Sequence, residues 1–477
     1  MKREISFLLS LFLIVSCQED LLNSDESALD NLDAIQTEME TVMIDEPFVF
    51  LSETDFDKWC HINEFENRVK ACEIPEDQLK IMTTEALLKS ILHYPLNYLY
   101  IAYDDPFEAI DIIMKYSTLH QEFVSRPDAA KTIMDSFKET TISFKENTVS
   151  KDYAVLTYVD EMFFEYFIAS KHVKGFNTPE LKSGLKEAIE KKIEERSDHE
   201  LYSINSIVPL MLISEKECLG VKNMEYTVLR NINSSVTLYT YFGRILEGTV
   251  YSEYAPYEIV SITDCYEDHF PYATVYLPAS KTYNCHFYAW EPVNPSGGNY
   301  WLERYNSRLA LQLGYFWTND LYVSCSESEA EKVYYYNGDH SAVVLSNGDY
   351  ISKWGQGPVM VHAPEYGPCG YNMSYRQYYK VRTDLPLNII QISGDTVVYP
   401  DEANDYIASL YNTPFTYVWS VRNWDNQTNT YSLHQVSSDE YQLTCLDYGV
   451  FTIRVDAYDN GQNVAYGELN VNCIPEF

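Results

Sequence analysis

The sequence has little positive charge for its length. Its 477 residues contain 34 Lys and Arg against 71 Asp and Glu, so the formal net charge is −37. Binding to nucleic acid requires a basic surface that neutralises phosphates, and adhesion to anionic lipid requires the same. We therefore expect no nucleic-acid partner and no electrostatic attachment to a membrane.

Apolar runs long enough to span a membrane are also absent. The apolar stretch 5–15 has 11 residues, interrupted by Ser6 and Ser10, whereas a membrane-spanning helix needs about 20. Lys2 and Arg3 precede it and Cys17 follows it, which is the layout of a signal peptide. Its end resembles the bacterial lipobox, which implies a lipoprotein signal peptide over 1–17 and lipidation of Cys17. The alternative is a plain signal peptide with an incidental Cys.

Acidic residues follow Cys17 directly. Gln18-Glu19-Asp20 resembles the signal that sends some Gram-negative lipoproteins to the cell surface, and 18–46 has the composition of a solvated acidic tether. We expect an exported outer-membrane lipoprotein whose acyl chains are its membrane attachment, exposed on the cell surface. A merely acidic linker would look the same, so a periplasmic location stays open.

Motifs for nucleotides and metals are missing as well. The sequence contains no Gly-rich phosphate loop, no Rossmann fingerprint and no Gly-x-Ser-x-Gly elbow. It also contains no Cys-x-x-Cys or His-x-x-x-His element. We expect no cofactor and no metal. The residue types leave open one alternative, a zinc site built from Cys285, His286, His340 and His362.

Three patterns of apolar residues divide the chain. Residues 47–215 have helical spacing, with start signals at Thr83 and at Thr178-Pro179. From about 220 the pattern changes to that of strands, and 386–477 alternates as in a sandwich. The predicted fold class is multidomain: an all-α N-terminal domain (47–215), an α+β central domain (220–383) and an all-β sandwich at the C-terminus (386–477).

The central region carries the candidate chemistry. Asn284 is a good helix cap, which places Cys285 at a helix N-terminus, where a thiolate is favoured. Downstream, two Asn-Gly-Asp turns divide 332–355 into three antiparallel strands, with His340 at the start of the middle one. A histidine fixed on a sheet and facing a cysteine at a helix start is the arrangement of a catalytic Cys–His pair. We therefore predict that Cys285 and His340 are catalytic.

These segments resemble the papain-like amidohydrolases of the NlpC and CHAP type. The resemblance is stronger to bacterial lipoproteins that share Tyr-Asn-Cys-His-x-Tyr-Ala-Trp (283–290), a His-Ser motif and Ser-Lys-Trp-Gly (352–355). It covers about 225–380, with similar helical segments at 82–88 and 94–96. It implies a papain-like domain, with a helix packed on an antiparallel sheet, and a thiol hydrolase that cleaves an amide bond in a peptidoglycan stem peptide or a protein. The usual Asp-Cys-Ser-Gly or Cys-Val-Glu element is absent, and His286 follows the Cys directly.

Papain-like enzymes also orient the catalytic histidine with a third polar group. The candidates are Ser352, Lys353, Gln356 and His362. A charged Lys353 cannot accept a proton from the imidazole, and NlpC-type enzymes often use a histidine here, so we choose His362. The oxyanion would be bound by the Cys285 backbone N–H together with a donor from Tyr283 or Asn284.

The cysteine count is consistent with a reactive thiol. With Cys17 acylated, nine of the ten cysteines remain, and an odd number in an exported chain leaves at least one free thiol. We assign Cys285 to that role. Two disulfides are plausible, Cys60 with Cys72 and Cys445 with Cys473, although a reducing habitat would leave all of these residues as thiols.

The C-terminal strands allow a second kind of function. Segments 417–421 and 448–455 resemble the polycystic-kidney-type (PKD) immunoglobulin-like modules of bacterial surface proteins. The alternative to an enzyme is therefore a non-catalytic surface lipoprotein with a degenerate papain-like domain, which binds a glycan or a protein partner. The oligomeric state has no signal in the sequence.

Overall fold

A computed structural model of the chain describes sixteen stretches of the sequence. They are 43–62, 65–142, 155–197, 201–221, 234–240, 244–292, 298–318, 320–336, 339–368, 375–382, 388–409, 416–423, 431–437, 440–446, 449–459 and 462–474. Cys17, the predicted signal peptide and nearly all of the predicted tether lie outside them. The chain divides into two units, Met1–Ile44 and Asp45–Phe477, and the helices and strands of the described stretches belong to the second unit.

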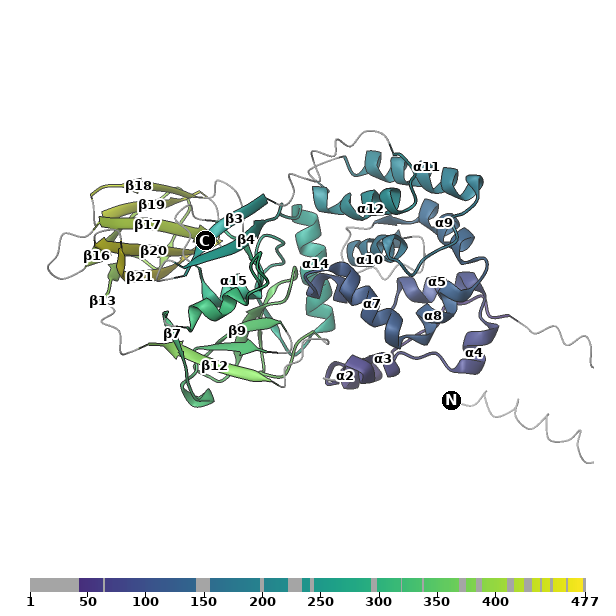
Figure 1. The fold of residues 1–477 in the computed structure, drawn as a ribbon, viewed down its shortest axis with the longest axis horizontal. Helices are drawn as coiled ribbons and strands as arrows, with labels where there is room; N and C mark the ends of the chain where they lie inside the picture. Colours follow the sequence, from purple (N-terminus) through teal and green to yellow (C-terminus); the bar gives the residue numbers. More distant parts are fainter. Residues whose placement is uncertain are drawn as a thin grey trace, which may run out of the picture. The chain divides into compact units, whose positions relative to one another are not determined.

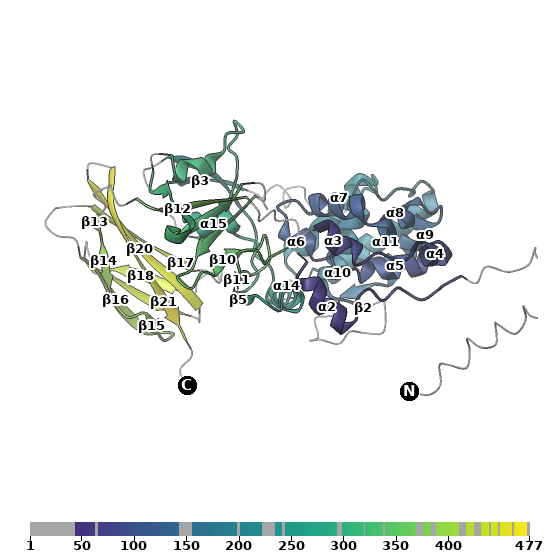
Figure 2. The same cartoon turned by 90° about the horizontal axis from the view of Figure 1, so that it is seen from below.

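Helices occupy the N-terminal half of this unit, and mostly antiparallel sheets occupy the C-terminal region (Figure 1; Figure 2). The caps predicted from the sequence are confirmed. The Thr83 hydroxyl accepts the N–H of Ala86 at 3.2 Å, and Thr178 accepts the N–H of Leu181 at 3.3 Å. The helices are α2 (Glu53–Cys60), α3 (Phe65–Lys70), α4 (Glu76–Ile81), α5 (Thr84–Leu92), α6 (Leu99–Ala102), α7 (Pro106–Tyr116), α8 (Thr118–Ser125), α9 (Ala129–Glu139), α10 (Tyr158–Ala169), α11 (Pro179–Glu195), η1 (Ile204–Ser206) and α12 (Val208–Lys216). A short parallel pair, β1 (Thr141–Ile142) and β2 (Val155–Leu156), lies between α9 and α10 in the sequence.

A seven-stranded antiparallel sheet comes next, in the order β5-β11-β10-β9-β8-β12-β7. The predicted three-strand meander is present as β8, β9 and β10. The strands are β5 (Thr274–Leu277), β7 (Tyr322–Ser324), β8 (Lys332–Tyr335), β9 (His340–Val344), β10 (Tyr350–Lys353), β11 (Val359–His362) and β12 (Arg376–Val381). The same region contains α14 (Pro256–His269), α15 (Cys285–Trp290), η2 (Gln312–Phe316) and η3 (Glu327–Glu329). A small sheet contains β3 (Ser234–Tyr239), β4 (Ile245–Val250) and β6 (Trp301–Leu302), and β3 pairs antiparallel with β4. This agrees with the change to a strand pattern that the sequence predicts from about 220.

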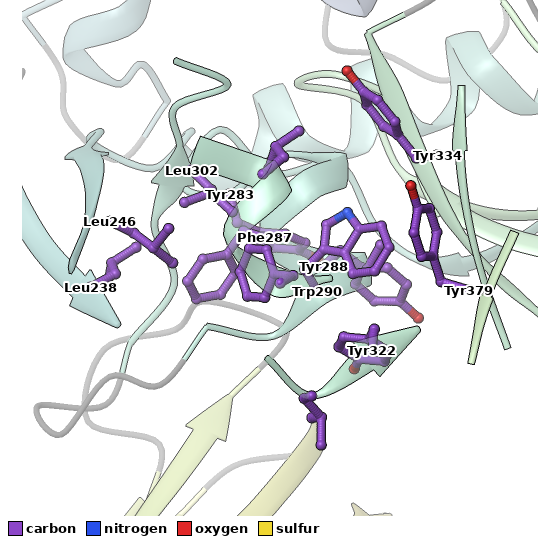
Figure 3. Packing of buried hydrophobic residues seen from close by; sticks show 14 of the residues in the cluster. Leu238, Leu246, Tyr283, Phe287, Tyr288, Trp290, Leu302, Tyr322, Tyr334 and Tyr379 are labelled. Atoms are coloured by element: carbon purple, nitrogen blue, oxygen red, sulfur yellow. The ribbon is translucent and has the colours of Figure 1, made fainter. Parts of the chain in front are cut away.

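The helix α15 packs on one face of the seven-stranded sheet. Its Phe287 and Trp290 are buried in a cluster with Tyr322, Tyr334 and Tyr379 (Figure 3). The Trp290 ring centroid is 5.5 Å from that of Tyr379 and 5.2 Å from that of Tyr322. Large aromatic side chains supply most of the apolar surface that this helix buries, so the aromatic contacts fix where the first turn of α15 lies.

The C-terminal region is a β-sandwich of two sheets around one core. One sheet contains β13 (Asn388–Ile389), β15 (Val397–Val398), β17 (Thr416–Asn423), β20 (Gly449–Asp459) and β21 (Gln462–Cys473). The other contains β14 (Gln391–Ser393), β16 (Ala403–Ser409), β18 (Tyr431–Gln435) and β19 (Glu440–Cys445). The strand pattern predicted for 386–477 is thereby confirmed, with segment 417–421 in β17 and most of segment 448–455 in β20.

The helical part contacts the seven-stranded sheet where β10 turns into β11. The N–H of Gln356 donates to the Ile101 carbonyl at 2.8 Å, at the end of α6. Gly355 has φ +58°, and a Cβ added there would lie 2.4 Å from the same carbonyl oxygen. Glycine is thus required here both by its backbone conformation and by the close approach of α6.

Replacing Gly355 with alanine should therefore weaken the fold. The left-handed backbone and the overlap with Ile101 together predict a loss of about 3 kcal/mol. Gly348 is the matched control, since its φ is +92° but an added Cβ would meet nothing within 4 Å. Gly348→Ala should cost about 1 kcal/mol. Thermal unfolding followed by circular dichroism compares the two variants, and equal midpoints would contradict the proposed contact.

Candidate functional site

The helix that carries Cys285 begins as the sequence predicts. Asn284 is extended and its side-chain oxygen accepts the N–H of Phe287 at 3.1 Å, which makes Cys285 the first residue of α15. The Asn284 amide also donates to the Leu302 carbonyl at 2.9 Å. The Asn284 side chain therefore ties the helix start to β6, so both of its polar atoms already have partners in the fold.

Cys285 lies at the edge of the packed interior. Only 6% of the residue is exposed, and its Sγ is 3.9 Å from the carbonyl oxygen of Asp339, the residue before β9. The helix has only six residues, so its dipole is a small contribution. Charged side chains near the sulfur must therefore determine its chemistry.

The imidazole beside Cys285 belongs to His286. Its Nε2 is 3.0 Å from Oδ1 of Asp339, and its Nδ1 is 2.9 Å from Oγ of Ser341. Burial acts to lower the pKa of His286, but the charge of the Cys285 sulfur and the hydrogen bond to Asp339 outweigh it and raise the pKa to about 10. At neutral pH the ring is then an imidazolium, which can donate from both nitrogens.

Asp339 and Ser341, which contact the two ring nitrogens of His286, each have a further partner. Arg304 Nε is 3.1 Å from Oδ1 of Asp339. Burial raises the pKa of Asp339, but the hydrogen bond and positive charge of His286 lower it below its usual value. On the other side, Trp290 Nε1 donates to the Ser341 hydroxyl at 2.9 Å. The ring orientation is thus fixed from the turn before β9 and from the end of α15.

His340 starts β9, as predicted, but its ring points away from α15. Successive side chains of a strand point to opposite faces. Ser341 points toward α15, where it contacts His286. The His340 side chain therefore lies on the other face, and its ring centroid is 5.3 Å from that of Tyr335, its partner on β8. The structure does not bring the His340 ring and the Cys285 sulfur together on one face, which differs from the geometry that the sequence suggested.

His362 lies on the same face as His340, because it pairs with Tyr350 of β10 in the same alternation. Its Nδ1 is 2.8 Å from the Ala363 carbonyl and its Nε2 is 2.8 Å from the Ser352 hydroxyl. A carbonyl only accepts, so Nδ1 carries the proton and Nε2 accepts from Ser352. Burial lowers the pKa of His362 to about 4, so this ring is neutral.

Burial likewise lowers the pKa of His340 well below its usual value, and the charges of His362 and His286 act in the same direction. His340 and His362 are therefore neutral histidines on the face opposite Cys285. Their catalytic roles stay predictions from the sequence.

Lys353 is on the α15 face and adds a second positive charge near the sulfur. Its Nζ donates to the carbonyls of Ser280 and Gly355, each at 2.8 Å, and to that of Gly357. Burial lowers the pKa of Lys353 to about 7, while the charges of the Glu253 carboxylate and the Cys285 sulfur act to raise it. Three carbonyl acceptors match the three N–H bonds of an ammonium group, so we describe Lys353 as charged. It ties β10 to the loop that precedes α15.

The remaining sequence candidates have other contacts. The Gln356 side chain accepts a hydrogen bond from the Tyr254 hydroxyl at 2.6 Å. Tyr283 is fully buried in the same core cluster as Phe287, with the Lys353 ammonium 5.1 Å from its ring centroid. These placements fit packing and loop anchoring.

The helical part also contributes a charge to this site. Asp104, in the loop between α6 and α7, accepts a hydrogen bond from the Trp301 side chain. Loss of solvation around the carboxyl group and the Asp339 carboxylate raise the pKa of Asp104, although the residue as a whole is exposed. Asp104 therefore brings an acidic group from the helical part close enough to Asp339 and His286 to interact with their charges.

Three other features bear on function. Within the described stretches, no group of three or more His, Cys, Asp or Glu is arranged to hold a metal ion. Among the helices in that part of the chain, none is both long enough and apolar enough to cross a membrane. Neither of the two plausible disulfides is formed, since Cys60, Cys72, Cys445 and Cys473 are all thiols. The thiols of Cys445 and Cys473 lie within hydrogen-bonding reach of each other.

Comparisons with known proteins add little. No family model matches the sequence, and no curated protein matches it. The solved structures that match over parts of the chain include the following two. One is the PKD domain of human KIAA0319, at 15% identity, covering 20% of this chain and 89% of that chain, with a TM-score of 0.16. The other is the mouse coronavirus receptor-binding domain with its murine receptor, at 11% identity, covering 31% of this chain and 87% of that chain, with a TM-score of 0.14. Neither likeness is close enough to carry an argument about function.

Sequence reasoning missed Asp339, Ser341 and Arg304, and it gave His286 no catalytic role. Two signals were present. Asp339 closes the first Asn-Gly-Asp turn, directly before the strand start that was singled out. Strand alternation also implies that His340 and Ser341 cannot both point toward one helix. The position of Arg304, far from both motifs in the sequence, had no local signal.

The charges around Cys285 predict a distinctive thiol reactivity. At pH 6 an ordinary thiol, with a pKa of about 8.5, is thiolate in only about 0.3% of molecules. Because His286 loses its proton only as the pH rises toward about 10, its charge is present throughout the range from pH 6 to pH 9. We expect iodoacetamide to label Cys285 at pH 6 at least tenfold faster than it labels the exposed Cys218.

Two variants distinguish the effects of His286 and His340 on the labelling of Cys285. Labelling sites and rates are measured by peptide mass spectrometry. His286→Gln should remove the preference for Cys285 at pH 6, and His340→Gln should leave it intact. The reverse result would show that the sequence-based pairing of Cys285 with His340 is the functional one.

Proposed function

We propose that this protein is an exported thiol hydrolase that cleaves an amide bond, with Cys285 as its nucleophile in a papain-like central domain. His286 is the proton carrier and Asp339 is the group that orients it. The observation that carries the proposal is the His286 imidazole, which directly follows Cys285 in the first turn of α15 and whose Nε2 is 3.0 Å from the Asp339 carboxylate. The charge of the Cys285 sulfur and the hydrogen bond to Asp339 raise the pKa of this ring to about 10. This is the composition of a Cys–His–Asp catalytic group, although its order in the sequence is unusual.

The chemistry would run in two steps. The Cys285 thiolate attacks the carbonyl carbon of the amide, and the imidazolium of His286 gives its proton to the leaving nitrogen as the C–N bond breaks. The products are a free amine and a thioester on Cys285. Neutral His286 then takes a proton from water, whose oxygen attacks the thioester and releases a carboxylic acid. The thiolate and imidazolium are restored, so no other reactant is consumed.

The substrate class follows from the resemblance and the predicted location. A peptidoglycan stem peptide or a protein is the expected substrate, and the lipidated Cys17 would hold the enzyme to the outer membrane. On the cell surface the enzyme would act on host proteins, on neighbouring cells or on shed wall fragments. On the periplasmic face it would act on the wall of its own cell.

Hydrolysis assays test this proposal directly. Purified sacculi and denatured casein are incubated with the full chain, and new amino groups are measured. Cys285→Ala should abolish release, and His286→Gln and Asp339→Asn should each lower it by about 100-fold or more. His340→Gln is the matched control, since it also removes a buried imidazole beside the same turn, and it should retain most of the activity.

Two outcomes would contradict the proposal. Loss of activity in His340→Gln but not in His286→Gln would transfer the proton-carrier role to His340. Equal, near-zero release from both substrates by the parent protein, with its fold intact by circular dichroism, would favour a non-catalytic surface lipoprotein that binds a glycan or protein partner.

A further inference from the structure

A cavity of about 210 Å³ lies between the seven-stranded sheet and the sandwich. One side of it is formed by the sheet face on which α15 packs, together with the second half of α15. The other side is formed by the outer face of β20 and β21. The two parts touch around it, since Asn299 Nδ2 donates to the Asn423 carbonyl at 2.8 Å and the Arg422 guanidinium lies 4.7 Å from the ring centroid of Phe287. Cavities at such junctions are common ligand sites.

The sheet side of the cavity is apolar and aromatic. Leu277, Val343 and Ile351 line it from three different strands, and Tyr276 and Tyr288 stand beside them. Tyr276 is 50% exposed at the rim, whereas Tyr288 is nearly buried. This wall offers C–H and ring surface but few polar atoms.

The sandwich side is polar. Thr452 and Asn470 face each other across β20 and β21, and the Thr452 hydroxyl donates to Oδ1 of Asn470 at 2.7 Å. That bond leaves the amide hydrogens of Asn470 directed elsewhere. Glu468, two residues before Asn470 and on the same face, completes this side with carboxylate oxygens.

The acidic groups of the cavity are already compensated by cations behind them. Arg454 Nη1 is 2.8 Å from Oε1 of Glu468, and Lys332 Nζ is 3.9 Å from Oε1 of Glu291. Burial and the nearby Glu291 carboxylate raise the pKa of Glu468. The cavity therefore presents hydrogen-bonding oxygens without a large net negative charge.

We propose that this cavity binds one neutral sugar ring, as a free monosaccharide or as one unit of a glycan. A pyranose has an apolar C–H face that fits the tyrosine and aliphatic wall, and an edge of hydroxyls that can donate to Glu468 and Glu291 and accept from Asn470. A purely apolar ligand would make no hydrogen bonds with this polar side of the cavity. An ammonium ligand would approach carboxylates that Arg454 and Lys332 already neutralise.

The site is separate from Cys285 and does not depend on the proposed hydrolase. The binding experiment therefore uses the full chain carrying Cys285→Ala, so that no turnover can interfere. The probes are glucose, galactose, mannose and N-acetylglucosamine, followed by ligand-observed NMR, with butylammonium as the cationic comparison. We expect at least one sugar to bind and butylammonium to give no signal.

Two variants locate the binding. Tyr276→Ala removes the ring at the rim and should weaken the bound sugar at least fivefold. Tyr257→Ala is the matched control, because Tyr257 is also 50% exposed but lies on α14 outside the cavity. Glu468→Gln should also weaken binding, since it replaces a carboxylate acceptor.

Each other outcome would overturn the proposal. Absence of binding by all four sugars at 50 mM would show that the cavity is not a sugar site. Binding of butylammonium in preference to every sugar would reassign it to a cation. Equal sensitivity to Tyr276→Ala and Tyr257→Ala would place the sugar elsewhere on the protein.

Discussion

The hydrogen-bonded pair of His286 and Asp339 is the interaction on which the candidate site depends. It joins the first turn of α15 to the turn before β9, and so it links the helix that presents the thiol to the sheet that supports it. A buried imidazolium would be costly without a partner. Here the partner is a carboxylate that Arg304 also contacts, which stabilises the charge next to Cys285.

The rest of the central region can be understood as support for that pair. Trp290 bonds Ser341, which bonds the other nitrogen of His286, and the Trp290 ring is packed among tyrosines of the sheet. Lys353 anchors the loop before α15, because its ammonium group donates to the Ser280 carbonyl. Positioning of this kind matters because catalytic groups act only within narrow limits of distance and angle.

Much of the fold could be predicted from the sequence because its signals are local. Side-chain caps at Thr83, Thr178 and Asn284 define helix starts through contacts three residues away, and alternation identifies the strands of the meander. Which side chains of one element point toward another element depends on the tertiary fold, not on local sequence. His340 was placed correctly at a strand start, but the face it occupies depends on which side of the sheet α15 packs. Arg304 and Asp104 reach the site through the tertiary fold alone.

The charge state of His286 tests the proposed pairing with Cys285 most directly. The ring can be followed by NMR in protein with labelled histidine, assigned with His286→Gln, across pH 5 to 11. We predict that His286 titrates at about 10 and that Cys285→Ala lowers this value, because the sulfur's charge is one of its causes. Titration near the ordinary histidine value of about 6.5, unchanged in Cys285→Ala, would contradict the proposed pairing.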